Sequence, residues 1–509
     1  MYPGTYARTA PDRPAVIMGG SGEVVTYAEL DARSNQLAHL LRARGLGPAD
    51  VVAFVMENNA AYHVVHWAAR RSGLYFVPIN PNLTAEEVAY IVNDSGATAL
   101  ITSAKCAPLA VELADLVPQV RLRLIVGAEL EGWEEVSSAG AALPTTPIED
   151  ELEGELLQYS SGTTGRPKGI KRAFTHRPIS LEADTTVMFL RAIGFFEQGV
   201  FLSPAPLYHT APQVWSAGVH RMGGTVVVME KFDPLFALEL IERHRVTHSL
   251  MVPTMFVRML KVPAAQRERF DHSSLATVVH AAAPCPVEIK RAMIDWWGPI
   301  ISEFYSSTEV AGATFITAPE WLEHPGSVGR PMLGTPHVVG ADGTEVGPGE
   351  VGQIWFDGGL PFEYLNDPGK TATAWDEHGW SSVGDIGYVD AEGYVYLTDR
   401  ASFMIISGGV NIYPQEAENV LIEHPAVLDA AVFGVPDPDM GEQVKAVVQL
   451  VDGSAGSVQV EAELLAYCRD RLAHYKCPKS IDFRTELPRS DTGKLFKKQL
   501  QQEYRTAPA

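Results

Sequence analysis

Short apolar runs alternate with amphipathic stretches through most of this 509-residue chain. Residues 26–44 place leucine and alanine at helical spacing and are followed by Gly45, a pattern that predicts a helix. Residues 51–56 predict a buried strand, residues 85–94 a second helix and residues 99–102 a second strand. This alternation favours an α/β fold with mostly parallel sheets.

The charge balance excludes some classes of partner. The chain has 40 Lys and Arg against 62 Asp and Glu, a net charge of −22, whereas a nucleic-acid-binding protein would be basic. We therefore expect no nucleic-acid partner. An anionic ligand would have to be held by local basic groups.

No run of 18 apolar residues occurs, so we expect no membrane span. The N-terminal residues do not resemble a secretory signal. The four cysteines form no CxxC pair and are typical of reduced thiols, which favours a cytoplasmic location; they are Cys106, Cys285, Cys468 and Cys477.

The sharpest motif is Tyr159-Ser-Ser-Gly-Thr-Thr-Gly-Arg-Pro-Lys-Gly169. Glycines and small hydroxyl residues let backbone N–H groups and hydroxyls converge on phosphate oxygens, and Lys168 adds a positive charge. A Walker loop needs Gly before its Lys and Ser or Thr after it, but Pro167 and Gly169 occupy those places. The motif predicts a phosphate-binding loop of another class.

This segment resembles the signature of the adenylate-forming superfamily, which includes acyl-CoA synthetases, peptide-synthetase adenylation domains and luciferases. Five further segments resemble the family's motifs in the same order, so that the resemblance covers nearly the whole chain. They are Tyr305-Ser-Ser-Thr-Glu309, Ser382-Val-Gly-Asp-Ile-Gly387, Tyr396-Leu-Thr-Asp-Arg400, Gly408-Gly409 with Pro414 and Glu416, and Pro488-Arg-Ser-Asp-Thr-Gly-Lys494.

The resemblance implies a large multi-subdomain N-terminal AMP-binding domain over residues 1–399, with mostly parallel sheets. It also implies a small mobile α+β C-terminal domain over residues 400–509. The cofactor-binding positions that it implies are Ser160, Ser161, Gly162, Thr163, Thr164, Gly165, Lys168, Ala282, Ala283, Tyr305, Ser306, Asp385, Arg400, Gly408 and Gly409.

Several of these side chains also suit the chemistry on their own. Tyr305 offers a flat face for adenine. Glu309 offers a hard oxygen to Mg²⁺, which binds through one or two carboxylates and the substrate phosphates. Asp385 lies between glycines, where a carboxylate can accept from both ribose hydroxyls, and Arg400 would hold the ribose or a phosphate.

Four residues are expected to be catalytic. By resemblance, Lys494 is the adenylation lysine, and a cation there would bridge the attacking carboxylate and the α-phosphate of ATP. Thr308 could bond to that phosphate or to the substrate carboxylate, beside Glu309. His209 matches the position that borders the acyl pocket of the family.

Two positions depart from the family pattern. Ser306 stands where the family usually has Gly, and its side chain could narrow the acyl pocket. Ser402 stands at the position of the family's hinge residue, which is often Asp or Lys.

In the family that this chain resembles, members that activate amino acids carry an Asp shortly after the position of His209, where it pairs with the α-amine. Residues 210–218 contain no acidic residue, so the resemblance favours a carboxylic acid without an α-amine. The candidate lining of the acyl pocket is apolar and comprises Ala211, Val214, Trp215, Ala311, Gly312 and Ala313.

We therefore predict an ATP-dependent carboxylic acid:CoA ligase that forms acyl-AMP and then acyl-CoA, with medium-chain fatty or aryl acids as substrates. ATP, Mg²⁺ and coenzyme A are the expected cofactors. An acyl-AMP ligase that loads a carrier protein is the alternative, and Lys494 and Glu309 argue against a non-catalytic nucleotide-binding module. The sequence leaves homodimer formation open.

Overall fold

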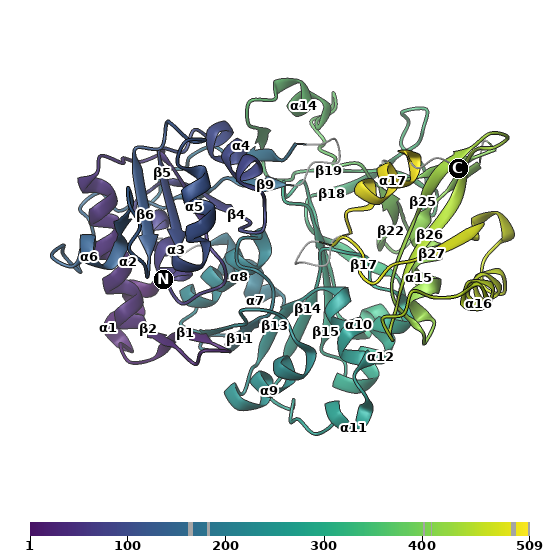
Figure 1. The fold of residues 1–509 in the computed structure, drawn as a ribbon, viewed down its shortest axis with the longest axis horizontal. Helices are drawn as coiled ribbons and strands as arrows, with labels where there is room; N and C mark the ends of the chain where they lie inside the picture. Colours follow the sequence, from purple (N-terminus) through teal and green to yellow (C-terminus); the bar gives the residue numbers. More distant parts are fainter. Residues whose placement is uncertain (161–165, 181–183, 401–402, 409, 490–494, 507–509) are drawn as a thin grey trace. The chain divides into compact units, whose positions relative to one another are not determined.

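The computed structural model describes residues 1–160, 166–180, 184–400, 403–408, 410–489 and 495–506 (Figure 1). These residues divide into two compact units. Unit 1 comprises residues 1–250, 270–277 and 361–373, and unit 2 comprises residues 251–269, 278–360 and 374–509. No helix in the described ranges is long and apolar enough to cross a membrane.

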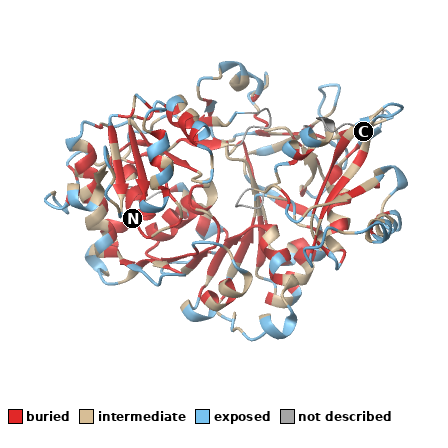
Figure 2. Ribbon diagram, viewed as in Figure 1, coloured by how far each residue is buried: buried red, intermediate tan, exposed pale blue. Residues whose placement is uncertain are grey.

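A six-stranded parallel sheet forms the first layer of unit 1. Its central strands are almost entirely buried and its two edge strands are half-buried (Figure 2), as expected of a parallel sheet covered by helices. In spatial order they are β7 (Glu134–Glu135), β6 (Leu122–Val126), β5 (Ala99–Ser103), β3 (Val51–Val55), β4 (Tyr75–Ile79) and β8 (Glu155–Leu156). The helices of this part are α1 (Pro3–Thr9), α2 (Tyr27–Ala43), α3 (Tyr62–Arg71), α4 (Ala85–Ser95), α5 (Ala107–Leu113) and α6 (Val136–Gly140).

The elements predicted for this layer are confirmed. The predicted helices at 26–44 and 85–94 are α2 and α4, and the predicted strands at 51–56 and 99–102 are β3 and β5. Capping boxes start both helices, Thr26 with Glu29 and Thr84 with Glu87. Gly96, with φ of 70°, ends α4.

The rest of unit 1 contains two further groups of strands. Strands β13, β11, β12 and β1 pair in parallel, and β2 closes that edge antiparallel. Strands β20, β10 and β9 form a small antiparallel sheet. The bounds are β13 (His248–Met251), β11 (Val200–Ser203), β12 (Thr225–Val228), β1 (Pro14–Met18), β2 (Val24–Thr26), β20 (Glu363–Tyr364), β10 (Lys168–Lys171), β9 (Gln158–Ser160), α7 (Thr185–Ala192), α8 (Thr210–Arg221), α9 (Pro234–His244) and α14 (Pro368–Thr373).

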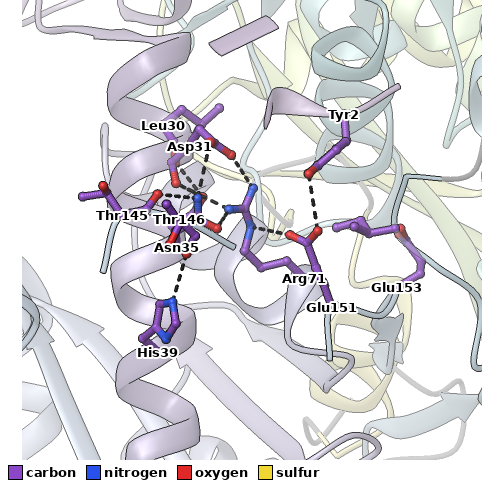
Figure 3. Close-up of polar contacts among 12 residues, drawn as sticks. Tyr2, Leu30, Asp31, Asn35, His39, Arg71, Thr145, Thr146, Glu151 and Glu153 are labelled. Carbon is purple, nitrogen blue, oxygen red and sulfur yellow. Dashed lines mark hydrogen bonds and ion pairs between the residues drawn. The ribbon is translucent and has the colours of Figure 1, made fainter. Parts of the chain in front are cut away.

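A buried ionic cluster ties α2 and α3 to the segment that leads into β8 and β9 (Figure 3). The side chain of Arg71 is fully buried; its Nη2 lies 2.8 Å from Oδ1 of Asp31, and its Nε lies 3.6 Å from Oε1 of Glu151. The hydroxyl of Tyr2 donates to Glu151 at 3.3 Å, and Asn35 donates to the carbonyl oxygen of Thr145 at 2.7 Å. Removing one partner from such a cluster leaves a buried charge unpaired.

In unit 2 the strand pairing changes from parallel to antiparallel. Strands β14 and β15 are parallel, and all pairs from β15 to β18 are antiparallel. The connection from β15 to β16 is too short for a parallel crossover. The bounds are β14 (Thr277–His280), β15 (Ile301–Ser306), β16 (Ala313–Ile316), β17 (Ser327–Leu333), β22 (Val395–Arg400), β21 (Asp385–Val389), β19 (Gly352–Asp357), β18 (Thr335–Val339), α10 (Pro253–Lys261), α11 (Ala264–Arg267), α12 (Val287–Trp297) and α13 (Ala318–Glu323).

The C-terminal part of unit 2 has its own five-stranded sheet and apolar core. Helix α15 (Pro414–Glu423) begins at Pro414, a residue that the first turn of a helix tolerates. The remaining elements are β23 (Ile405–Ser407), β24 (Val410–Ile412), β25 (Val427–Asp437), β26 (Gly441–Leu450), β27 (Ser480–Phe483), α16 (Val458–Arg469) and α17 (Lys497–Thr506).

Candidate active site

The described flanks of the predicted phosphate loop are two paired strands of unit 1. Strands β9 and β10 pair antiparallel, with Ser160 opposite Lys168 and Tyr159 opposite Gly169. Ser161, Gly162, Thr163, Thr164 and Gly165 lie outside the described residues. The described flanks show that the motif leaves one strand and returns along its neighbour.

Contacts of two tyrosines, Tyr159 and Tyr364, hold the described ends of these two strands in place. The hydroxyl of Tyr159 donates to Oδ2 of Asp94 at 2.6 Å. A Cβ at Gly169 would come within 2.9 Å of the Tyr159 ring, so glycine is required by the close approach. The ammonium of Lys168 lies 5.5 Å from the ring centroid of Tyr364. Sequence reasoning assigned Lys168 to phosphate and missed this aromatic neighbour.

His209 caps the N-terminus of α8, and its ring lies 4.4 Å from that of Tyr208. The segment before it is held by two polar side chains of unit 1. Asn58 accepts from the N–H of Leu207 at 2.8 Å, and Tyr62 donates to the Leu207 carbonyl oxygen at 2.8 Å. These supports were not predicted, because their chain positions carry no motif.

Three predicted nucleotide-binding residues lie together in unit 2. The hydroxyl of Tyr305 donates to Oδ2 of Asp385 at 2.7 Å, across 80 residues of sequence. Nε of Arg400 lies 2.9 Å from Oδ1 of the same carboxylate. Asp385 and Arg400 are register partners on β21 and β22. The antiparallel pairing of β21 and β22 therefore places the motifs of Asp385 and Arg400 side by side, and β15 places Tyr305 next to them.

Electrostatics couple this group to Glu309. Burial raises the pKa of Tyr305 well above its ordinary value, and the Asp385 carboxylate raises it further. Asp385 also raises the pKa of Arg400, and Glu309 contributes to both shifts. The side chain of Glu309 is buried. Tyr305 and Arg400 therefore stay protonated at neutral pH beside two carboxylates.

The predicted adenine wall follows β14. Ala282 has a φ of 74° and is exposed, and Ala283 is half-buried. A left-handed alanine is uncommon and often marks a functional site. Beneath this turn, Glu303 lies 2.7 Å from Nζ of Lys290 and 3.3 Å from Nε2 of His280. Burial opposes ionisation of Glu303, but these two neighbours lower its pKa to about 2.

The side chain of Ser306, where the family usually has Gly, makes a hydrogen bond within the turn that follows β15. Its hydroxyl donates to the carbonyl oxygen of Gly312 at 2.7 Å, which closes the turn after β15. Val310 within this turn has a φ of 55°, a strained conformation for a β-branched residue. A Cβ at Gly312 would lie 2.1 Å from the ring of Phe356. The turn that carries Thr308 and Glu309 is thus tightly packed at its end.

The C-terminal site residues are described only in part. Gly408 has a φ of 56° and donates its N–H to the carbonyl oxygen of Met440 at 2.8 Å. Gly409, Lys494 and the hinge candidate Ser402 lie outside the described residues.

Sequence reasoning also missed Asp399, which lies inside a quoted motif. Its Oδ2 accepts from the N–H of Gln415 at 3.2 Å, and its Oδ1 accepts from the N–H of Arg400 at 2.6 Å. It thereby connects β22 to the first turn of α15, where a negative charge is favourable.

The donor set fits Mg²⁺ held mainly through a nucleotide. Glu309 supplies one hard carboxylate oxygen, and the described ranges contain no group of three or more potential ligands from His, Cys, Asp and Glu. Mg²⁺ commonly takes one or two carboxylates and fills its remaining positions with phosphate oxygens and water. Glu309 is therefore a suitable single protein ligand for magnesium bound with ATP.

Known relatives cover the whole chain. A feruloyl-CoA synthase of Amycolatopsis sp is 36% identical over 99% of this chain and 98% of its own length. A long-chain-fatty-acid–CoA ligase of Mycobacterium tuberculosis is 33% identical over 98% of this chain and 97% of its own. A fatty acid–[acyl-carrier-protein] ligase of Streptomyces coeruleorubidus is 31% identical over 98% and 95%.

Solved structures agree with these relatives. ATP-bound MatB of Rhodopseudomonas palustris has a TM-score of 0.81 at 28% identity, covering 99% of both chains. The o-succinylbenzoate CoA synthetase of Bacillus subtilis, solved with its acyl-adenylate intermediate, has a TM-score of 0.79 at 28% identity, covering 98% of this chain and 97% of that one.

Residues 5–363 match the AMP-binding enzyme family, and residues 416–494 match the AMP-binding enzyme C-terminal domain. The predicted α/β fold and the predicted superfamily are both confirmed. The chain belongs to the AMP-binding enzymes, in the acyl-CoA synthetase branch of the adenylate-forming superfamily.

Proposed function

We propose that this protein is an AMP-forming carboxylic acid:CoA ligase that joins a medium-chain fatty or aryl acid to coenzyme A through an acyl-adenylate. The observation that carries the proposal is the cluster of Tyr305, Asp385 and Arg400, three motif residues joined by contacts of 2.7 and 2.9 Å. Family membership, with matches over residues 5–363 and 416–494, and the acyl-CoA synthase relative support the use of ATP and CoA.

In the first half-reaction, a carboxylate oxygen of the acid attacks the α-phosphorus of ATP and pyrophosphate leaves. Asp385 accepts from the ribose hydroxyls, and Arg400 binds ribose or phosphate. The hydroxyl and glycine residues of the hairpin loop bind the departing phosphates. Lys494 bridges the two negatively charged reactants, which offsets their repulsion. Mg²⁺, bound through Glu309 and the phosphates, would neutralise charge on the leaving group.

In the second half-reaction, the thiol of CoA attacks the carbonyl carbon of acyl-AMP, and AMP leaves. The segment at Gly408 and Gly409 would receive the pantetheine arm, and rotation of residues 400–509 about the 400–402 region would exchange it with Lys494. His209 would border the acyl group. The boundary between the domains at residues 399 and 400 belongs to this proposal.

Two observations support the proposed class of acid: the small apolar residues expected to line the acyl pocket, and the names of the relatives. Ala311 and Ala313, which follow Thr308 and Glu309 in the chain, are buried in unit 2. An apolar lining gains about 0.8 kcal/mol per buried CH₂, so affinity should rise several-fold per methylene until the pocket ends. Relatives named for feruloyl and fatty acyl substrates fit an aryl or alkyl acid.

Transfer of the acyl group to a carrier protein is the second candidate, supported by the 31% identical relative that is named for this reaction. A cytoplasmic location is also proposed, and homodimer formation stays open. Light scattering of the purified protein decides the oligomeric state.

The test is a panel of carboxylic acids from acetate to long-chain and aryl acids, assayed with ATP and Mg²⁺. Pyrophosphate release and thioester formation are measured with CoA and, separately, with an acyl-carrier protein. We expect medium-chain or aryl acids to give the highest kcat/KM, with thioester formed on CoA. Acetate as the best substrate would refute the acid class, and a product only on the carrier protein would favour the second candidate.

A further inference from the structure

Two ion pairs flank the segment that carries Lys494. Before it, the guanidinium of Arg489 binds both oxygens of Asp429, with Nε 2.5 Å from Oδ2 and Nη2 2.6 Å from Oδ1. After it, Nζ of Lys497 lies 2.7 Å from Oε1 of Glu418. We call these four charged residues the neck. Residues 490–494 themselves lie outside the described part of the chain.

The backbone closes the same neck. The N–H of Phe496 donates to the carbonyl oxygen of Pro488 at 2.8 Å. Arg489 and Leu495 form an antiparallel bridge. The two chain ends that enter and leave residues 490–494 are therefore held side by side by backbone as well as by charge.

The neck is anchored in regular structure. Asp429 lies on β25 and Glu418 on α15, and Glu418 also accepts from the N–H of Val432 on β25 at 2.7 Å. The side chains of Lys497 and Glu418 are only 6% and 7% exposed. Buried, charge-assisted and bidentate contacts hold their partners in one geometry more tightly than exposed contacts do.

The chain on each side of residues 490–494 forms what we call a stem, and apolar packing fixes both stems to the same core cluster. Leu487, before the neck, and Leu500, after it, are buried in one core cluster with Ala431, Phe433 and Val447. Each stem is therefore attached to the sheet independently of residues 490–494.

We propose that Asp429 and Glu418 are positioning residues for adenylation, because they fix, through Arg489 and Lys497, the two stems that flank Lys494 in the chain. This inference rests on the role proposed above for Lys494. A catalytic cation that bridges two substrates is sensitive to displacement, and an error of about 1 Å can cost roughly 100-fold in rate. The second half-reaction does not use Lys494 and should not depend on the neck.

The experiment measures the two half-reactions separately in Asp429→Asn and Glu418→Gln, which keep side-chain size and remove charge. Adenylation is followed by pyrophosphate release from acid and ATP, and thioester formation by supplying acyl-AMP and CoA. We expect adenylation to fall about 10- to 100-fold and thioester formation to stay at the wild-type rate. Arg489→Lys keeps the charge but loses the bidentate contact with Asp429. Its adenylation rate should lie between those of the wild type and Asp429→Asn.

The matched control is Asp482→Asn, which removes a carboxylate from another ion pair of the same part of the chain, 2.6 Å from Nζ of Lys445. It should leave both half-reactions unchanged. Equal loss of both half-reactions in the neck variants, or no loss in Arg489→Lys and Asp429→Asn, would overturn the inference. Lys494→Ala separates the two levels: if it leaves adenylation intact, the role proposed for Lys494 is itself wrong.

Discussion

At the scale of single residues, Asp385 connects two other predicted site residues. It accepts from Tyr305 and pairs with Arg400, and all three were predicted from separate motifs to bind nucleotide. The sequence could predict their chemistry because each motif has a characteristic composition. It could not predict that Tyr305 would bond to Asp385, since that depends on the alignment of β15 with β21.

Replacing Asp385 by Asn tests this residue. The variant loses the charge that would accept from the ribose hydroxyls, and hydrogen bonds to charged groups contribute about 1.5–3 kcal/mol. We expect the KM for ATP to rise about tenfold or more, with the KM for the acid unchanged. The control is Asp390→Asn at the other end of the same hairpin, where Asp390 accepts from the N–H of Glu392. Equal effects of the two substitutions, or a change confined to the acid, would contradict the assignment.

At the scale of elements, local sequence signals predicted single helices correctly. Apolar residues at helical spacing, followed by Gly45 and Gly96, predicted helices α2 and α4. Contacts between elements were not predictable. Arg71 follows another arginine in the last turn of α3, and only the fold shows that Asp31 and Glu151 surround its side chain.

Substitution of Arg71 by Met tests how much the buried cluster stabilises unit 1. The change leaves Asp31 and Glu151 without their cation, and breaking a buried pair costs about 3–5 kcal/mol. We expect the free energy of unfolding, measured by urea denaturation, to fall by that amount. The control is Arg44→Met, which removes an exposed pair with Glu134 and should cost about 1 kcal/mol or less. A loss no larger than that of the control would show that the cluster does not stabilise the fold.

At the scale of the whole molecule, buried histidines predict a loss of stability in acid. Burial lowers the pKa of His220 and of His248 from 6.5 to about 4, and lowers those of His63 and His66 as well. Below pH 6.5 the unfolded chain protonates these imidazoles while the folded chain does not. The unfolded state then binds more protons, so stability is complete above pH 6.5 and decreases toward pH 4.

Each such histidine costs up to roughly 3 kcal/mol by pH 4. We expect the melting temperature to fall steadily between pH 7 and pH 5. His63→Phe should reduce that slope, because neither ring nitrogen of His63 has a hydrogen-bond partner among the described residues. Melting temperatures that stay constant over this range, or an unchanged slope in His63→Phe, would contradict the explanation.

The family could be predicted from the sequence because six motifs occur in the expected order across the chain. The ion pairs that we propose to position the site could not be predicted from the sequence. Asp429 and Glu418 belong to no motif, and their pairing with Arg489 and Lys497 follows from how β25 and α15 pack.

The most direct test of the proposed two-step ligase compares wild type and Lys494→Ala in each half-reaction. The proposal predicts that the variant loses about two to three orders of magnitude in pyrophosphate release from acid and ATP, as when one transition-state donor is removed. It also predicts that supplied acyl-AMP is still converted to acyl-CoA at the wild-type rate. An equal loss in both half-reactions would contradict the division of labour on which the account depends.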